Sequence, residues 1–220
     1  MALTPSTMLP LGTALPFAAI SAELAAGSVR QVSGEPLAIE TLGQRPLLVL
    51  FVCAHCPFVK HVEPEITRLQ ADFATPSAAP ATSTSAAGGP EPPLALLAIS
   101  SNSTVTHPQD GPEGLRAQAE RHGWRFPYLF EQGQQLARAF RAACTPDPFL
   151  FAPAADGQQR LVYRGQLDAS RPGNAEPLDG RDIRAAIAAV LAAEPVAAEQ
   201  RPAIGCNIKW HPGEEPEWAR

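Results

Sequence analysis

The chain has 220 residues, of which 45% are hydrophobic, and its formal net charge is −5. These values are typical of one water-soluble globular domain with added segments, and they do not suggest a nucleic acid or an anionic membrane surface as a partner. Four cysteines are too few for a disulfide scaffold, so any close pair among them indicates catalysis or metal binding.

The N-terminal segment is fairly apolar but lacks the features of a signal peptide. Residues 1–26 lack a positively charged start, and Pro5, Pro10 and Pro16 would interrupt a helix. Nowhere in the chain does an apolar stretch approach the ~18 residues of a membrane span. We therefore expect a cytoplasmic protein without a membrane segment, with an N-terminal extension at 1–30 and its main domain at 31–200.

The clearest local pattern lies around residue 50. An apolar run at 47–52 predicts a central, fully buried strand. The run ends at the tetrapeptide Cys53-Ala54-His55-Cys56. Between Val59 and Phe73, apolar residues then recur at spacings of three and four, which predicts an amphipathic helix.

The rest of the main domain alternates between predicted strands and helices. Residues 75–93 have low complexity and no large apolar side chain, which predicts a flexible insertion. After it we predict strands at 94–99 and 128–130, helices at 113–122 and 136–143, paired strands at 148–151 and 161–164, and a last helix at 181–193. This order predicts an α/β protein with a layered sheet. Apolar residues in the tail, 201–220, predict that it packs on the domain.

The cysteine pair lies where the predicted strand meets the predicted helix. Side chains three residues apart in a first helical turn are neighbours, so Cys53 and Cys56 can form a disulfide after a small adjustment. We expect the positive end of the helix to lower the pKa of Cys53. In the predicted reaction Cys53 attacks a disulfide, and Cys56, one turn into the helix and more buried, resolves the product.

Other residues near the pair bear on its chemistry. A protonated His55 would stabilise the thiolate and raise the reduction potential, although His55 can also be read as an exposed turn residue.

Zinc would need two more ligands at suitable spacing, which the sequence lacks, so we predict no metal. No phosphate-binding glycine loop is present, so we expect no cofactor. The segment Asp110–Glu113 is predicted to be a solvated turn.

The strand–CxxC–helix pattern, followed far downstream by Thr145-Pro146, resembles the thioredoxin superfamily. The resemblance implies a thioredoxin-like fold, with a central mixed β-sheet flanked by helices. It also implies a cis bond at Pro146, facing the CxxC pair, and a substrate peptide bound along the backbone of Thr145. The expected partners are a protein or small-molecule disulfide and an upstream thiol reductant, and the expected assembly is a monomer or dimer.

A narrower resemblance rests on several segments together. They are Phe51–Lys60, Phe126–Leu129, Cys144–Asp147, Tyr163–Gly165 and Gly205–Trp210. These segments are similar to a peroxiredoxin-like branch of the redoxin proteins, which implies thiol peroxidase activity as an alternative function. However, Leu50 stands at the position where true peroxiredoxins have a threonine. A hydrogen-bond donor for the peroxide is therefore missing.

Two further questions stay open from the sequence. A copper-binding chaperone on the same fold would use Cys53, Cys56 and one histidine, either His55 or His61. The remaining cysteines have no fixed role: Cys144 is either a second resolving thiol or an inert buried residue, and Cys206 pairs with Cys144 or with another chain.

Overall fold

The computed structural model describes residues 3–37, 39–42, 45–74 and 92–219. The insertion predicted at 75–93 lies outside the described residues, apart from its last two positions. The helices are α1 (Phe17–Ala25), α2 (Pro57–Phe73), α3 (Pro112–His122), α4 (Gln135–Ala139) and α5 (Arg181–Leu191). The strands are β1 (Leu3–Pro5), β2 (Val29–Gln31), β3 (Leu47–Phe51), β4 (Ala95–Ser100), β5 (Tyr128–Glu131), β6 (Cys144–Thr145), β7 (Asp147–Pro153), β8 (Gln159–Arg164) and β9 (Ile204–Asn207).

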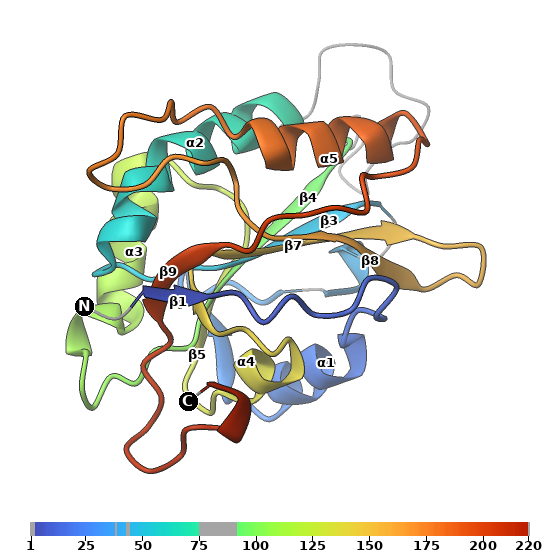
Figure 1. Ribbon diagram of the computed structural model, residues 1–220. Helices are drawn as coiled ribbons and strands as arrows, with labels where there is room; N and C mark the ends of the chain where they lie inside the picture. The colour runs from blue at the N-terminus through green and yellow to red at the C-terminus, as the bar shows by residue number, and fades with distance from the viewer. Residues whose placement is uncertain (1–2, 38, 43–44, 75–91, 220) are drawn as a thin grey trace.

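A six-stranded mixed sheet forms the centre, in the order β2-β5-β4-β3-β7-β8. The strands β3, β4 and β5 run parallel, whereas β2, β7 and β8 pair antiparallel to their neighbours. Helices α2, α3 and α5 lie on one side of this sheet, and α1 and α4 lie on the other (Figure 1). The predicted thioredoxin-like α/β fold is confirmed by this arrangement.

The residues of β3 explain why both faces are covered. All five residues of this strand are buried. Leu48 and Leu50 point into the core beneath α2 and α5, while Leu47, Val49 and Phe51 point into a second core on the side of α1 and α4. A continuous apolar run is the pattern expected of a strand that is covered on both faces.

The register of the sheet brings two distant loops together. Phe51, the last residue of β3, pairs with Asp147, the first residue of β7. Because these strands are antiparallel, the residues that follow Phe51 run past those that precede Asp147. Cys53 and Thr145 therefore meet at the same edge of the sheet, and the bond between Thr145 and Pro146 is cis, as predicted.

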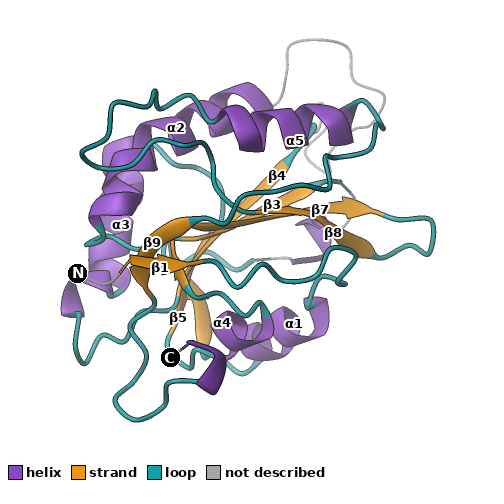
Figure 2. Ribbon diagram, in the orientation of Figure 1, coloured by secondary structure: helices purple, strands orange, loops and turns teal. Residues whose placement is uncertain are grey.

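A second, smaller sheet joins the two ends of the chain. Its order is β1-β9-β6, with Leu3 opposite Cys206 and Thr145 opposite Cys206 on the other side. The first strand of the chain therefore lies against the last beside the residues of β6, as the adjacent β1 and β9 arrows in Figure 2 show. Among the described helices, none combines the length and the apolar character that a membrane span requires.

Two predictions about the elements were wrong. The helix expected over 136–143 ends at Ala139, since Arg141 adopts a positive φ of 49° and the chain turns into β6. Cys56 was expected one turn into a helix, but it is the N-cap of α2, with extended backbone angles, and Pro57 is the first helical residue. Proline is favoured at that first position, where its missing N–H costs no helical hydrogen bond.

Candidate functional site

The two cysteines of the CxxC segment lie together under the surface. Both are free thiols, and both are 0% exposed. The expectation that Cys56 is the more buried of the two was therefore wrong. Burial of Cys53 follows from the cover above it, since Ala54 and His55 are only partly buried and form the outer layer of the loop.

Thr145 touches both thiols. Its Oγ1 lies 3.5 Å from the Sγ of Cys53, and its carbonyl oxygen lies 3.2 Å from the Sγ of Cys56. The sheet register places this residue there, because Thr145 directly precedes the cis proline at the start of β7. The structure thus brings together four of the predicted site residues, Cys53, Cys56, Thr145 and Pro146.

Asp110 organises the loop that carries the cysteines. It is 0% exposed, and its Oδ1 accepts hydrogen bonds from the backbone N–H groups of Ala54 (2.9 Å) and His55 (3.0 Å). Its Oδ2 lies 2.5 Å from Nδ1 of His55 and accepts a bond from Asn102 at 2.8 Å. The prediction of a solvated turn at this position was wrong. No local sequence signal marks Asp110, because Ala54 and His55, whose loop it holds, lie 56 and 55 residues earlier in the chain.

His55 is oriented by Asp110 rather than by the thiol. A carboxylate only accepts hydrogen bonds, so Nδ1 of His55 carries the proton and donates it to Asp110. The same nitrogen lies 3.7 Å from the Sγ of Cys53. Burial opposes the charge on Asp110, but the hydrogen bonds from His55 and Asn102 outweigh it and hold the pKa of Asp110 below its ordinary value.

A buried polar chain supports the loop from behind. Gln118, on α3, donates from Nε2 to the carbonyl oxygen of Cys53 at 3.1 Å and to Oε1 of Glu63 at 2.7 Å. The hydroxyl of Tyr128 donates to Oε1 of Gln118 at 3.0 Å. Because these bonds satisfy buried groups, they fix the position of the Cys53 backbone against α2 and α3.

The C-terminal tail covers the other flank of the thiols. Cys206, on β9, lies opposite Thr145, whose carbonyl oxygen contacts the Cys56 thiol. Further along the tail, the backbone N–H of Lys209 donates to Oδ1 of Asn102 at 2.8 Å. Since Asn102 also binds Asp110, one polar chain connects the tail to the CxxC loop.

The two thiols of the pair differ in acidity. The hydrogen bond from Cys53 lowers the pKa of Cys56 to about 5, although burial acts in the opposite direction. Burial, the bond to Cys56 and the negative charge of Asp110 raise the pKa of Cys53 well above its ordinary value. The expected lowering at Cys53 was therefore wrong. The helix starts one residue after Cys56, so its N-terminus lies closest to that sulfur.

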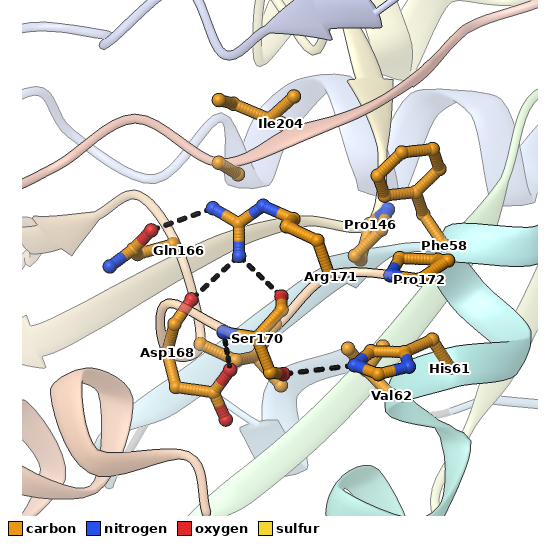
Figure 3. A pocket seen from close by; sticks show the side chains of 12 residues that line it. Phe58, His61, Val62, Pro146, Gln166, Asp168, Ser170, Arg171, Pro172 and Ile204 are labelled. Carbon is orange, nitrogen blue, oxygen red and sulfur yellow. Dashed lines mark hydrogen bonds between the residues drawn. The ribbon is translucent and has the colours of Figure 1, made fainter. Parts of the chain in front are cut away.

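A shallow pocket opens beside the cis proline. Figure 3 shows Phe58 and His61 of α2 on one side of it, with Pro146 between them and the loop that carries Arg171. The guanidinium of Arg171 is fixed by hydrogen bonds to the carbonyl oxygens of Asp168 and Ser170 and to Gln166. Ile204, the first residue of β9, closes the pocket on the tail side.

The remaining residues singled out from the sequence, Cys144 and His61, contact groups other than the two thiols. Cys144 is 0% exposed, and its Sγ lies 3.7 Å from the carbonyl oxygen of Pro146. His61 bonds to the hydroxyl of Ser170 at 3.0 Å. By contrast, ligand atoms of Cys53, His55 and Asp110 all lie within 4.8 Å of one another.

Comparison with known proteins identifies relatives of similar length. An uncharacterized conserved protein from Geobacillus kaustophilus is 36% identical, covering 97% of this chain and 98% of that chain, with a TM-score of 0.77. A hypothetical protein from Sinorhizobium meliloti is 33% identical, covering 96% of this chain and 100% of that one, with a TM-score of 0.76. No family model and no curated protein matches the sequence.

A more distant similarity concerns redox proteins. A thiol:disulfide interchange protein of the thioredoxin family, from Chlorobium tepidum, is 15% identical, with a TM-score of 0.49. The match covers 74% of this chain and 90% of that chain.

Proposed function

The chain belongs to the same family as the Geobacillus kaustophilus and Sinorhizobium meliloti proteins, and we propose that it is a thiol–disulfide oxidoreductase. The observation that carries the proposal is the placement of two free thiols, Cys53 and Cys56, against the same residue, Thr145, at the junction of β3 and α2. A thiol beside another of strongly lowered pKa is suited to exchange with a disulfide, because the neighbouring thiolate can accept its proton as it attacks.

Cys53 is the attacking residue in this proposal. It lies directly beneath the partly exposed His55, whereas Cys56 is enclosed by Cys206 and Thr145. Cys53 attacks one sulfur of the substrate disulfide, its proton passes to Cys56, and the other substrate sulfur leaves as a thiolate. The Cys56 sulfur then attacks the Cys53 sulfur, the bond between Cys53 and the substrate breaks, and the Cys56 proton ends on the second substrate sulfur. That sulfur departs as a thiol, and a Cys53–Cys56 disulfide remains.

The substrate is a protein or small-molecule disulfide. The pocket beside Pro146 is lined by Phe58, two residues after Cys56, and by Arg171, so it suits a substrate with an apolar and a polar part. An external thiol reductant returns the Cys53–Cys56 disulfide to the dithiol. Peroxidase activity is a weaker alternative, because the buried Leu50 offers no donor to a peroxide.

Trapping with oxidised glutathione tests the reaction and its order. We expect Cys56→Ser to stop at a glutathione adduct on Cys53, and wild type to proceed to the internal disulfide. Intact-mass and peptide mass spectrometry distinguish these products. The matched variant Cys53→Ser identifies the attacker, since an adduct on Cys56 would reverse the roles. Failure of wild type to form the internal disulfide, with no adduct in either variant, would contradict the oxidoreductase proposal.

Metal binding is a second candidate function, favoured by the close approach of Cys53, His55 and Asp110. His61, the other histidine considered as a metal ligand, is hydrogen-bonded to the hydroxyl of Ser170 instead. A thiolate, an imidazole and a carboxylate form a donor set typical of zinc rather than of copper(I), which prefers sulfur. Elemental analysis of freshly purified, reduced protein tests this function: a stoichiometric metal that is lost in His55→Ala would support it.

A further inference from the structure

A third thiol belongs to the same cluster as the CxxC pair. Cys206 is only 3% exposed, and β9 places it opposite Thr145, the residue that touches both other thiols. Cys206 belongs to the same cluster of buried residues as Cys53 and Cys56. The residue opposite Cys206, Thr145, places its carbonyl oxygen 3.2 Å from the Cys56 sulfur, so Cys206 is a third thiol beside the pair.

Cys144, the remaining thiol, is not part of this cluster. It precedes Thr145 in β6 and lies opposite Asn207 rather than Cys206. Successive side chains of a strand point to opposite sides, so Cys144 points away from the side on which Thr145 contacts the pair. Its sulfur instead contacts the carbonyl oxygen of Pro146. Cys144 thus provides a buried thiol close in space but outside the cluster.

We propose that Cys206 is a third redox residue, which takes over the disulfide after Cys53 and Cys56 have formed it. The inference rests on the oxidoreductase function proposed above. The Cys206 sulfur attacks the Cys56 sulfur, the Cys53–Cys56 bond breaks, and the proton of Cys206 ends on Cys53. One S–S bond replaces another, so no further oxidant or reductant is consumed. Cys53 is restored as a thiol, and the disulfide now joins α2 to β9.

The charges around Cys206 favour this order of events. In the reduced protein, burial together with the hydrogen bond and negative charge of Cys56 raises the pKa of Cys206 to about 12. When Cys56 is bonded to Cys53 it carries no charge, so those two influences disappear while Lys209 continues to favour the thiolate. Burial continues to oppose the Cys206 thiolate, but Cys206 is a better nucleophile once the first disulfide exists than it is in the reduced protein.

Peptide mapping distinguishes the two disulfides without ambiguity. Trypsin does not cleave before Pro46 or Pro202, so Cys53 and Cys56 share the peptide 31–60 while Cys206 lies in the peptide 185–209. A Cys53–Cys56 disulfide stays within the first peptide. A Cys56–Cys206 disulfide links the two peptides. The protein is oxidised with oxidised glutathione, alkylated, and digested under non-reducing conditions after the monomer has been isolated.

We expect wild type to give the cross-linked peptides together with the internal disulfide. Cys53→Ser cannot form the first disulfide and should therefore give no cross-link, Cys206→Ser loses the cross-link completely while still forming Cys53–Cys56, and the control Cys144→Ser behaves as wild type. Full formation of Cys53–Cys56 in wild type without any cross-link would overturn the role of Cys206 and leave the oxidoreductase function intact, and a cross-link that persists in Cys53→Ser would overturn the proposed order of the two disulfides. Absence of both disulfides would overturn both proposals.

Discussion

At the scale of single residues, the redox pair is governed by a charge that lies beside it. Asp110 accepts the Nδ1 proton of His55, so the two residues act on Cys53 as a unit. The carboxylate disfavours a negative charge on Cys53, and the imidazole moderates that effect by donating its proton to the carboxylate. We propose that this unit sets the reduction potential, in the tuning role expected of His55.

Substitutions of the two residues should shift the potential in opposite directions. His55→Ala leaves Asp110 without its imidazole partner, which destabilises the thiolate form, so we expect a lower reduction potential. Asp110→Asn removes the negative charge, which stabilises the thiolate and raises the potential. Equilibration with a glutathione redox buffer measures both. Asp110→Asn also disrupts buried hydrogen bonds, at a cost of roughly 1–3 kcal/mol of stability.

Asp156→Asn is the control for this pair of variants. Asp156 is exposed, lies in the turn between β7 and β8, and is paired with Arg160. The Asp156→Asn variant should leave the reduction potential of the cysteine pair unchanged. A shift of the same sign in His55→Ala and Asp110→Asn would contradict the opposing roles assigned to the imidazole and the carboxylate.

At the scale of elements, β9 covers the redox pair. Its glycine, Gly205, allows β9 to approach the backbone of β6 closely. A Cβ atom on Gly205 would lie 2.1 Å from the carbonyl oxygen of Thr145, which belongs to the backbone of β6. No side chain fits at that distance. Because β9 pairs with β6 through only two residues, displacement at Gly205 would separate the strands and expose the thiols.

Gly205→Ala should therefore open the site. We expect its Cys53 and Cys56 thiols to react faster with a chromogenic aryl disulfide than those of wild type, and the protein to lose about 1–3 kcal/mol of stability. Gly133→Ala is the matched control, because its nearest neighbours are side-chain atoms 3.9 Å away. Equal thiol reactivity in the two variants would show that β9 does not limit access.

At the scale of the whole molecule, one buried carboxyl group links stability to pH. Asp147 is 0% exposed, and burial raises its pKa to about 7, although hydrogen bonds from Ser6 and from the backbone of Ala143 act in the opposite direction. The ordinary value is 3.8. Between these values, the folded state holds a proton that the unfolded chain has lost, so stability falls as pH rises through this window and levels off above it.

Urea unfolding at about pH 5 and about pH 8 measures this dependence. We expect wild type to be less stable at the higher pH, by an amount on the order of a few kcal/mol. Asp147→Asn does not ionise, so its stability should change less between the two conditions. An identical change in wild type and Asp147→Asn would exclude Asp147 as the source.

Much of the central sheet was predictable because its signals are local. The apolar runs that became β3 and β4 are long, and Gly123 ends α3 with the positive φ expected of a helix terminus. The CxxC segment and Thr145-Pro146 could likewise be placed at one site, because a resemblance supplied the pairing that spacing alone does not.

The parts that escaped prediction depend on contacts between distant segments. Asp110 lies in a Gly- and Pro-containing segment that looks like any solvated turn, and only the fold brings it to the cysteine loop. The strands β1 and β9 have three and four residues, too few for a recognisable pattern, and they pair across almost the entire chain. The contact of Cys206 with Cys56 follows from that pairing.

The pairing of β1 with β9 also sets when the site closes during synthesis. The cysteine loop is made about 150 residues before Cys206, so at roughly 5–20 residues per second it waits on the order of 10–30 s for its cover. Throughout that interval the nascent chain exposes Cys53 and Cys56 to the surrounding thiols and disulfides. The last strand to leave the ribosome is thus the one that encloses the redox pair.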